Sequence, residues 1–351
     1  MSGWRTLAYR VVRPLLFAFE TERIHRLTIN GLRLAGANPI GRALLGVAGG
    51  APSLAQRGTV QVAGLAFRSR VGIGAGFDKD ARALRGWAAL GAGFAEVGTV
   101  TPLAQAGNPR PRLFRLVADD ALVNRMGFNN AGAASLAREV MLARPRLPEG
   151  FVVGVNIGRG VETPPHEAVN DYVEAFRLVA PVADYVAVNV SSPNTAGLRD
   201  LQDPARLSAL LAALREAGRE QRHPPPLFVK LAPDLAPAAF DALLDALAGT
   251  ADGLILSNTT TDRDGLRSTA RNEGGGLSGR PLRDGMLAAL ARAGDRAPAL
   301  PRIASGGLFD ASDVAAAYAA GADLVQLWTG MVYRGPGLIG EASRVPHPRG
   351  G

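Results

Sequence analysis

The chain has 351 residues, of which 47% are hydrophobic and 20% charged, and this apolar content excludes a wholly disordered protein. It contains no cysteine, which excludes disulfide scaffolds, thiolate metal sites and cysteine nucleophiles. The formal charge is +8, but aromatic residues make up only 6% and do not interleave with the basic ones, so we expect no nucleic-acid partner.

Residues 1–45 are predicted to form a pair of amphipathic helices. Residues 1–42 carry seven Arg against two Glu, so this segment holds +5 of the net charge. Leu7, Val11 and Leu15 recur at helical spacing. An Arg-rich amphipathic segment of this kind is typical of a membrane interface, although a helix pair packed on the main domain explains the periodicity equally well. No run approaches the 18 or so uncharged apolar residues that a membrane-spanning helix needs.

The segment 46–340 shows a regular alternation of short apolar runs and helical stretches. A β-hairpin is predicted over 59–71, and eight apolar runs that end in Gly, Asn, Ser or Thr cover 71–76, 94–100, 151–158, 185–191, 227–233, 253–259, 302–307 and 323–330. Eight β–helix units predict an α/β fold of the (β/α)₈ TIM-barrel type, with the N-terminal helices as an extension and 341–351 as a tail. The alternative, a doubly wound open sheet, lacks its G-x-G-x-x-G fingerprint.

Barrels place their chemistry at the C-terminal ends of the strands, and both lysines of the chain fall there. Lys79 follows the first run and Lys230 lies in the fifth, whereas every other basic side chain among the 39 is Arg. Lysine supplies a compact point charge that the wide guanidinium cannot. Amide side chains crowd the same face, namely Asn156, Asn189, Asn194 and Asn258, with Asn124 just outside it. The pattern predicts a site for a planar, hydrogen-bonding, anionic ligand.

Two kinds of chemistry remain open for this rim. The four His residues are scattered away from the predicted strand ends and no cluster has metal-ligand spacing, so we expect no metal. Lys230 could form a Schiff base in a non-redox lyase, which is a common barrel chemistry. The amides, together with the glycines after the last two runs where barrels bind phosphate, favour a flavin nucleotide instead.

A set of dispersed motifs then carries a specific resemblance. In order they are AGFDKD, EVGTVTP, GNPRPRLFRL, NRMGFNN, GVNIG, VNVSSPNT, VKLAPD, SNTT, GGLSGRPL and LVQLWTG. They resemble the membrane-associated, quinone-dependent class of dihydroorotate dehydrogenase over almost the whole chain. The resemblance implies an FMN-dependent oxidoreductase of de novo pyrimidine biosynthesis, with one FMN per chain. It would oxidise (S)-dihydroorotate to orotate, passing a hydride to FMN and electrons on to a membrane quinone.

The resemblance also implies roles for individual residues. FMN contacts would fall on Ala75, Gly76, Phe77, Asp78, Lys79, Thr99, Asn156, Asn189, Lys230, Ser257, Gly279, Gly307, Trp328 and Thr329. Dihydroorotate would contact Lys79, Asn124, Arg125, Met126, Gly127, Phe128, Asn189, Asn194, Asn258 and Thr259. The catalytic base would be Ser192. Without the resemblance, the sequence favours a turn serine at this position. The polar segment 193–206 would form a lid over the site.

The second half-reaction would use the N-terminal helices as an apolar entrance for ubiquinone or menaquinone. His25 and Arg115 match positions that line this tunnel, although the sequence alone suggests a surface histidine and a salt-bridged arginine. The family usually has Tyr where this chain has Trp328. We expect a monomeric peripheral protein at the cytoplasmic face of a bacterial inner membrane. There are three alternative interpretations. One is a cytosolic member of the family, which would need Cys as its base. The others are the non-redox lyase and a membrane scaffold without catalysis.

Overall fold

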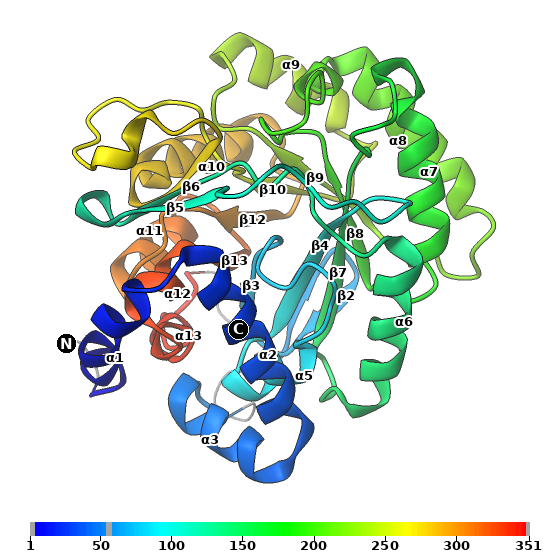
Figure 1. The fold of residues 1–351 in the computed structure, drawn as a ribbon. Helices are drawn as coiled ribbons and strands as arrows, with labels where there is room; N and C mark the ends of the chain where they lie inside the picture. Colours follow the sequence, from blue (N-terminus) through cyan, green and yellow to red (C-terminus); the bar gives the residue numbers. More distant parts are fainter. Residues whose placement is uncertain (1–3, 54–57, 349–351) are drawn as a thin grey trace.

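A computed structural model describes residues 4–53 and 58–348, and its centre is a closed barrel of parallel strands (Figure 1). The strands follow the order β10-β12-β13-β3-β4-β7-β8-β9 around the barrel. Their bounds are β3 (Val71–Ile73), β4 (Phe94–Val100), β7 (Val152–Ile157), β8 (Tyr185–Asn189), β9 (Leu227–Leu231), β10 (Gly253–Leu256), β12 (Arg302–Ser305) and β13 (Leu324–Leu327). Each lies inside one of the eight predicted apolar runs, which confirms the predicted barrel.

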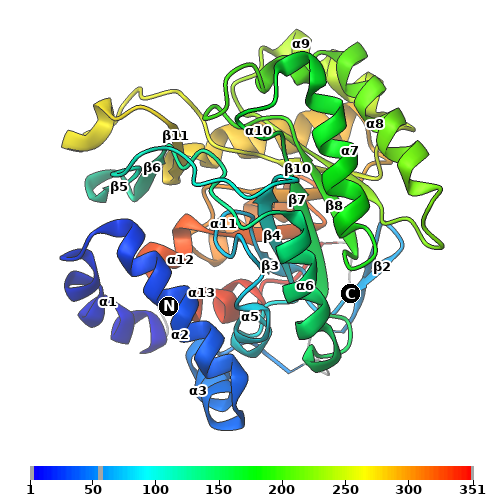
Figure 2. The ribbon, with the colours of Figure 1, turned by 45° about the vertical axis from the view of Figure 1, so that its right-hand side comes forward.

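Helices surround the barrel because each connection returns the chain to the start of the next parallel strand. They are α5 (Leu84–Leu90), α6 (Ala133–Ala143), α7 (Ala168–Val179), α8 (Pro204–Gly218), α9 (Pro237–Leu247), α10 (Arg283–Arg296), α11 (Ala311–Ala319), α12 (Thr329–Arg334) and α13 (Gly337–Ala342). Local signals set their starts: Asp203 caps α8, its carboxylate accepting from the Arg206 N–H at 3.0 Å, and Asp310 caps α11 in the same way. Figure 2 shows α6 to α9 side by side along one side of the barrel.

The N-terminal end of the barrel is closed by the predicted hairpin, β1 (Val60–Val62) and β2 (Leu65–Phe67). Phe67 packs edge-on against Phe94, with ring centroids 5.3 Å apart, in a core cluster at this end of the strands. The strands make room by using glycine, since a Cβ on Gly154 would lie only 2.0 Å from the Tyr185 ring. The barrel is therefore filled at this end, and any site must lie at the other.

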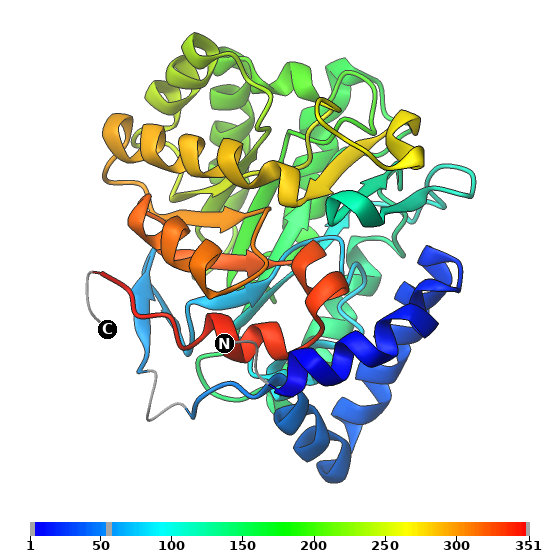
Figure 3. The same ribbon diagram turned by 90° about the vertical axis from the view of Figure 1, so that its left-hand side faces the viewer.

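A small antiparallel sheet that the sequence analysis does not predict lies at the opposite end. It contains β5 (Leu113–Leu116), β6 (Ala121–Asn124) and β11 (Gly276–Gly279), in the order β11-β6-β5. In Figure 3 the hairpin and this sheet stand at opposite ends of the barrel. The remaining elements are single turns of 3-10 helix at Val117–Asp119, Arg144–Arg146, Pro165–Glu167, Arg199–Gln202, Thr269–Asn272 and Arg280–Leu282.

Three helices, rather than the predicted pair, precede the barrel: α1 (Trp4–Phe17), α2 (Thr21–Ala37) and α3 (Pro39–Gly49). Helices α2 and α3 lie beside α5, and α1 lies beside α12 and α13 (Figures 1 and 3). Close contact between α2 and α5 depends on small residues, because a Cβ on Gly36 would lie 2.6 Å from the Gly86 nitrogen. The third helix runs past residue 45, where the sequence analysis ends the extension. Residues 1–3 of that segment and 349–351 of the predicted tail lie outside the described residues.

Within the described residues, no helix combines the length and the apolarity that crossing a bilayer requires. The N-terminal helices nevertheless expose large apolar side chains to solvent. Leu7, Val11 and Leu15 of α1 are 61%, 77% and 64% exposed. Because they are spaced four residues apart, they lie on one face of the helix.

Candidate active site

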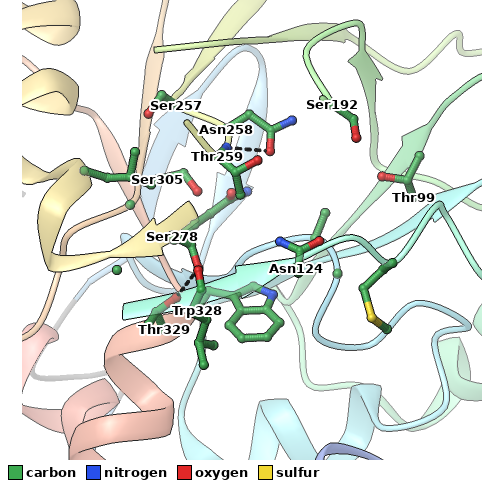
Figure 4. A pocket seen from close by; sticks show the side chains of 18 of the residues that line it. Thr99, Asn124, Ser192, Ser257, Asn258, Thr259, Ser278, Ser305, Trp328 and Thr329 are labelled. Carbon is green, nitrogen blue, oxygen red and sulfur yellow. Dashed lines mark hydrogen bonds between the residues drawn. The ribbon is translucent and has the colours of Figure 1, made fainter. Parts of the chain in front are cut away.

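A cavity of about 1120 Å³, including the open space at its mouth, lies at the C-terminal ends of the barrel strands (Figure 4). Part of its lining comes from β6 and β11 of the small sheet. Most of the residues predicted for FMN line it: Ala75, Gly76, Lys79, Thr99, Asn189, Lys230, Ser257, Gly279, Gly307, Trp328 and Thr329. Most of those predicted for dihydroorotate do so too, namely Asn124, Met126, Gly127, Phe128, Asn194, Asn258 and Thr259, together with Ser192.

Phe77, Asp78, Asn156 and Arg125 do not line the cavity but lie behind its wall. The Asp78 carboxylate accepts hydrogen bonds from the backbone N–H groups of Arg82 and Ala83 at 2.8 and 2.7 Å. Its burial raises its pKa to about 6. These bonds fix the turn that carries Lys79.

Phe77 and Arg125 also support neighbouring parts of the wall. The Phe77 ring lies 4.8 Å from the Trp328 ring, centroid to centroid. The Arg125 guanidinium pairs with Glu273 at 2.6 Å and lies over the Phe114 ring. We therefore assign the side chains of Phe77 and Arg125 a supporting position rather than a direct contact with a ligand.

Amide side chains at the strand ends are joined in one hydrogen-bonded network. Asn189 Nδ2 donates to Thr99 Oγ1 at 3.0 Å and to Asn156 Oδ1 at 3.1 Å. Asn258 Nδ2 donates to Asn189 Oδ1 at 3.2 Å. Because β4, β7 and β8 are neighbours in the barrel, these side chains meet although they are far apart in sequence. The network holds the amides in fixed orientations before any ligand binds.

The two lysines differ in their surroundings. Lys79 Nζ donates to Asn129 Oδ1 at 2.5 Å, and burial, with a smaller effect of the Arg112 charge, lowers the pKa of Lys79 to about 7. Lys230 is only 5% exposed, and its Nζ lies 3.6 Å from Glu96 Oε1. Lys79 can therefore gain or lose its proton near neutral pH, while Lys230 has a buried counterion.

Ser192 lies directly after β8 and faces the cavity (Figure 4). Its Oγ accepts from the Asn194 backbone N–H at 3.3 Å, as in a serine turn, so the side chain combines a turn contact with a position in the cavity wall. Asn194 Nδ2 in turn donates to the Asn124 carbonyl at 3.1 Å. The segment that follows thus reaches the small sheet across the cavity mouth.

The predicted lid over 193–206 is only partly loop. Residues 199–202 form a 3-10 turn and α8 begins at Pro204, so only 193–198 is loop. Arg159 donates to the Ala196 carbonyl, and Arg199 donates to the Ser191 carbonyl at 3.2 Å. Both guanidinium groups tie this loop to the rim of the barrel.

A second cavity, of about 920 Å³ including its open mouth, lies between the N-terminal helices and the barrel. Its lining is mainly apolar and includes Leu16, Phe17 and Ile24, and its polar members include Tyr9, Arg115 and two threonines. Arg115 makes no ion pair among the described residues; it donates to the carbonyls of Phe17 and Phe19 at 3.2 and 2.8 Å and lies over the Phe17 ring. The salt bridge expected for Arg115 from the sequence alone is therefore wrong.

The two cavities share four lining residues: His25, Leu113, Leu122 and Trp328. His25 is not a surface histidine, nor is it remote from the strand ends. Its Nε2 lies 2.6 Å from the Phe77 carbonyl, so this nitrogen carries the proton, and burial lowers the pKa of His25 to about 4. The Trp328 nitrogen lies on the side of Gly76, where an added Cβ would approach it to 3.4 Å. The neutral imidazole of His25 and the indole of Trp328 thus belong to the wall between the two cavities, which we call the partition.

Comparison with known proteins assigns this chain to a family. The sequence model described as dihydroorotate dehydrogenase matches residues 58–344. A relative from Halorhodospira halophila named dihydroorotate dehydrogenase (quinone) is 46% identical, over 96% of this chain and 97% of its own length. One of the same name from Deinococcus radiodurans is 47% identical, over 95% and 93%. The chain belongs to the quinone-dependent dihydroorotate dehydrogenase family.

Solved structures agree with this assignment. The crystal structure of a ligand-free dihydroorotate dehydrogenase from Eimeria tenella is similar with a TM-score of 0.79 at 36% identity, covering 89% of this chain and 93% of that one. The complex of the Eimeria tenella enzyme with ferulenol gives a TM-score of 0.78 at 38% identity, covering 82% of both chains. The family model begins after α3, but the Halorhodospira halophila dihydroorotate dehydrogenase (quinone) covers 96% of this chain, so its match extends into the N-terminal helices.

Several residues of this dihydroorotate dehydrogenase cavity are absent from the sequence-based predictions. Ser278 and Gln326 line it, and Glu96 lies beneath it. Ser278 belongs to the unpredicted β11. Glu96 lies inside β4 and Gln326 inside β13. Each is a polar residue in an otherwise apolar run, and this pattern could have indicated that both belong to the site.

Proposed function

We propose that this chain oxidises dihydroorotate to orotate in pyrimidine biosynthesis, with FMN as cofactor and a membrane quinone as electron acceptor. One observation carries the proposal: the more polar of the two cavities, which holds Ser192, Lys79 and Lys230, adjoins the apolar one across His25 and Trp328. The first suits a charged pyrimidine beside a flavin, and the second suits a hydrophobic electron acceptor. A Schiff-base lyase would need neither the second cavity nor the amide network.

The residues of the first cavity fit FMN. The Ser257 hydroxyl and the Gln326 amide oxygen are buried without a hydrogen-bond partner among the described residues, as expected of groups that await a ligand. Gly307 has φ +71° and leaves no room for a Cβ, which would lie 2.5 Å from Arg283 Cα, so only glycine suits this turn at the expected phosphate end. When bound, FMN supplies a two-electron acceptor for the hydride of the substrate. We expect one FMN per chain.

The substrate would lie between the amide network and Lys79. Asn124, Asn194 and Asn258 can satisfy the polar edges of a pyrimidine, and the Lys79 ammonium can neutralise its carboxylate. Ser192 accepts the proton from C5 of dihydroorotate in this proposal. Since a neutral hydroxyl is a weak base and no described basic side chain contacts its Oγ, the Ser192 proton passes to a water molecule. The anchored loop 193–198 limits exchange with bulk solvent.

The quinone would enter between the N-terminal helices and approach the partition. His25 is neutral and its Nε2 is occupied by the Phe77 carbonyl, so Nδ1 remains as an acceptor. The Trp328 nitrogen lies on the side of Gly76, away from the apolar cavity, so we do not assign it a contact with the quinone. Arg115 supports the cavity by holding the end of α1. Either ubiquinone or menaquinone suits an apolar lining of this kind.

We further propose that α1 to α3 attach the protein to the membrane surface as a peripheral protein. Their exposed apolar side chains and the excess of Arg over residues 1–42 support this placement. The relatives compared above are bacterial, and we propose the cytoplasmic face of a bacterial inner membrane as the location. We expect a monomer.

Spectroscopy of the purified protein tests the proposed function. We expect a yellow flavin spectrum that dihydroorotate bleaches under anaerobic conditions. Ubiquinone or menaquinone analogues should restore the colour, and fumarate and NAD should not. A colourless protein that takes up no FMN would refute the proposal, and borohydride trapping of a substrate on Lys230 would favour the lyase.

The pKa of Lys79 leads to a prediction for the pH dependence of ligand binding. Because burial lowers this pKa to about 7, the ammonium is present below pH 7 and is lost above it. We expect the dissociation constant of the anionic product orotate to rise by about tenfold per pH unit above pH 7, and to level off below it. The measurement is a titration of the flavin absorbance with orotate between about pH 6 and pH 9.

The matched variant for this measurement is Lys79→Arg. The guanidinium stays charged throughout this range, so the variant should bind orotate more weakly overall but with a flat pH profile. A wild-type dissociation constant that does not change above pH 7 would contradict a loss of the Lys79 proton in this range, and orotate binding by Lys79→Arg as tight as by the wild type at pH 6 would contradict the assignment of Lys79 to the carboxylate.

A further inference from the structure

Glu96 is a fully buried carboxylate beneath the floor of the site cavity. It lies on β4, and its Oε1 accepts from Asn156 Nδ2 at 2.8 Å. Its Oε2 accepts from Gln326 Nε2 at 2.6 Å and from the Tyr185 hydroxyl at 3.1 Å. Burial, followed by the Glu96 charge, raises the pKa of Tyr185 well above its usual range, so this phenol remains a donor. Three neutral donors therefore surround the carboxylate.

The charge of Glu96 is balanced by Lys230. The ammonium lies 3.6 Å from Glu96 Oε1, and this is the one ion pair that Lys230 makes among the described residues. Both side chains are buried, 7% exposed for Lys230 and 0% for Glu96. In such surroundings either charge alone would be strongly unfavourable, so each depends on the other. The cation that lines the cavity is thus half of a neutral pair.

The carboxylate also sets the direction of the amide network. A carboxylate can only accept hydrogen bonds, so Asn156 must turn its NH₂ toward Glu96 and its Oδ1 toward the rim. There the Asn156 oxygen accepts from Thr99 Oγ1 and from Asn189 Nδ2, at 2.5 and 3.1 Å. Asn189 is left with its own oxygen facing Asn258. One buried anion therefore fixes which polar atoms the strand ends present.

Gln326 responds to Glu96 in the same manner. Since Gln326 Nε2 donates to Glu96, its Oε1 is turned away, and this oxygen is buried without a hydrogen-bond partner among the described residues. Gln326 lines the cavity, as does Lys230. A ligand over the floor would meet an acceptor and a cation whose positions depend on Glu96.

We propose that Glu96 is a positioning residue that tunes the bound flavin, by holding and partly neutralising Lys230 and by fixing the orientation of the floor amides. This inference rests on the proposed function, because it presupposes that FMN occupies the cavity. Removing the negative charge would leave an unbalanced cation in the lining of the cavity that FMN would occupy, and a cation near the flavin would stabilise the added electrons of its reduced form. Glu96 thus keeps the flavin from becoming too strong an oxidant.

The test compares purified Glu96→Gln holoenzyme with the wild type. Sulfite adds reversibly to oxidised flavin, so its dissociation constant reports how readily the ring accepts electron density. We expect sulfite to bind about tenfold more tightly to Glu96→Gln, and the two-electron midpoint potential to rise by the equivalent of about 30 mV. A dissociation constant for sulfite within twofold of the wild-type value, together with a midpoint potential shifted by less than about 10 mV, would overturn the proposal.

Two further variants separate charge from general damage. Glu96→Asp keeps the charge and should hold the potential near the wild-type value even if FMN binds more weakly. Asp184→Asn removes a carboxylate at the other end of the barrel, which pairs with Arg144 at 2.7 Å and accepts from the Val153 N–H at 2.6 Å. It should lower thermal stability without moving the potential. A shift in Asp184→Asn equal to that in Glu96→Gln would contradict a specific role of Glu96.

If Glu96→Gln does not fold, the double variant Glu96→Gln/Lys230→Gln decides the question. It removes both charges, so it should recover the folded barrel if the unpaired ammonium caused the failure. A double variant that is equally unfolded would show that the hydrogen bonds of Glu96, rather than its charge balance with Lys230, decide folding, and would refute the charge-balancing part of the proposal. Absence of FMN from the wild-type protein is a separate result, which would instead refute the proposed function.

Discussion

Ser192→Ala should abolish the bleaching of the flavin by dihydroorotate while leaving FMN bound. The expected loss in the rate of flavin reduction at neutral pH is about 10²- to 10⁴-fold, the usual contribution of a positioned general base. The fold should survive, because the substitution removes only the acceptor of the Asn194 N–H at the cavity mouth. Anaerobic stopped-flow absorbance measures the reduction rate, and the flavin-to-protein absorbance ratio measures FMN content.

Ser191→Ala is the matched control for this prediction. Ser191 is also buried directly after β8, and its hydroxyl accepts from Asn258 Nδ2 at 2.9 Å, but it does not line the cavity. We expect less than about a tenfold loss from this variant, since it removes two neutral hydrogen bonds, the one from Asn258 and the one that the hydroxyl donates to Asn189 Oδ1 at 3.3 Å. If Ser192→Ala bleaches as fast as Ser191→Ala, Ser192 is not the base.

The triple variant Leu7→Gln/Val11→Gln/Leu15→Gln should release the protein from membranes. Each of these α1 side chains is more than 60% exposed, and burying one in the interface contributes about 1 to 1.5 kcal/mol. Together they amount to about 3 to 4.5 kcal/mol, or a loss of roughly 10²- to 10³-fold in vesicle binding. Reduction of the flavin by dihydroorotate should be unchanged, because α1 does not line the first cavity. Co-sedimentation with phospholipid vesicles measures the binding.

Three exposed apolar residues elsewhere provide the control for α1. Leu103 after β4 and Met141 and Leu142 in α6 are 77%, 58% and 55% exposed. Their triple replacement by Gln removes a comparable apolar area and leaves the N-terminal helices intact, so vesicle binding should persist. Equal sedimentation of the two triple variants would exclude α1 as the membrane-binding surface. These substitutions test the membrane contact more specifically than removal of residues 1–42 would. The deletion would also remove Glu22, which is the buried ion-pair partner of Arg112 at 2.9 Å.

The barrel could be predicted because its signals are local. Each strand is a short apolar run that ends in a turn former, and the structure retains all eight. The sheet of β5, β6 and β11 escaped prediction because β11 pairs with β6 from about 150 residues away, and no local pattern indicates such a pairing. The helix α3 was missed because its Gly-containing sequence is ambiguous, although Asn38 caps it by accepting from the Gly41 N–H at 2.7 Å.

The residue types at the strand ends indicated the position of the site, but the sequence did not show which groups these residues contact. The position of Lys230 on the barrel rim follows from its place in an apolar run, whereas its pairing with Glu96 requires the three-dimensional arrangement of β4 and β9. His25 illustrates the same limit, since a helix residue near the N-terminus reaches the Phe77 carbonyl, 52 residues away. Patterns along the chain indicate which groups are available, and the closure of the barrel determines which of them meet.

The partition formed by His25 and Trp328 has a kinetic consequence. Because the two cavities meet only along shared walls, dihydroorotate and the quinone can occupy the protein without competing for space. Orotate should therefore inhibit competitively against dihydroorotate but not against the quinone, and compounds that fill the apolar cavity should show the converse. Double-reciprocal plots at several quinone concentrations would then be parallel lines, the signature of two half-reactions that alternate on a single carrier.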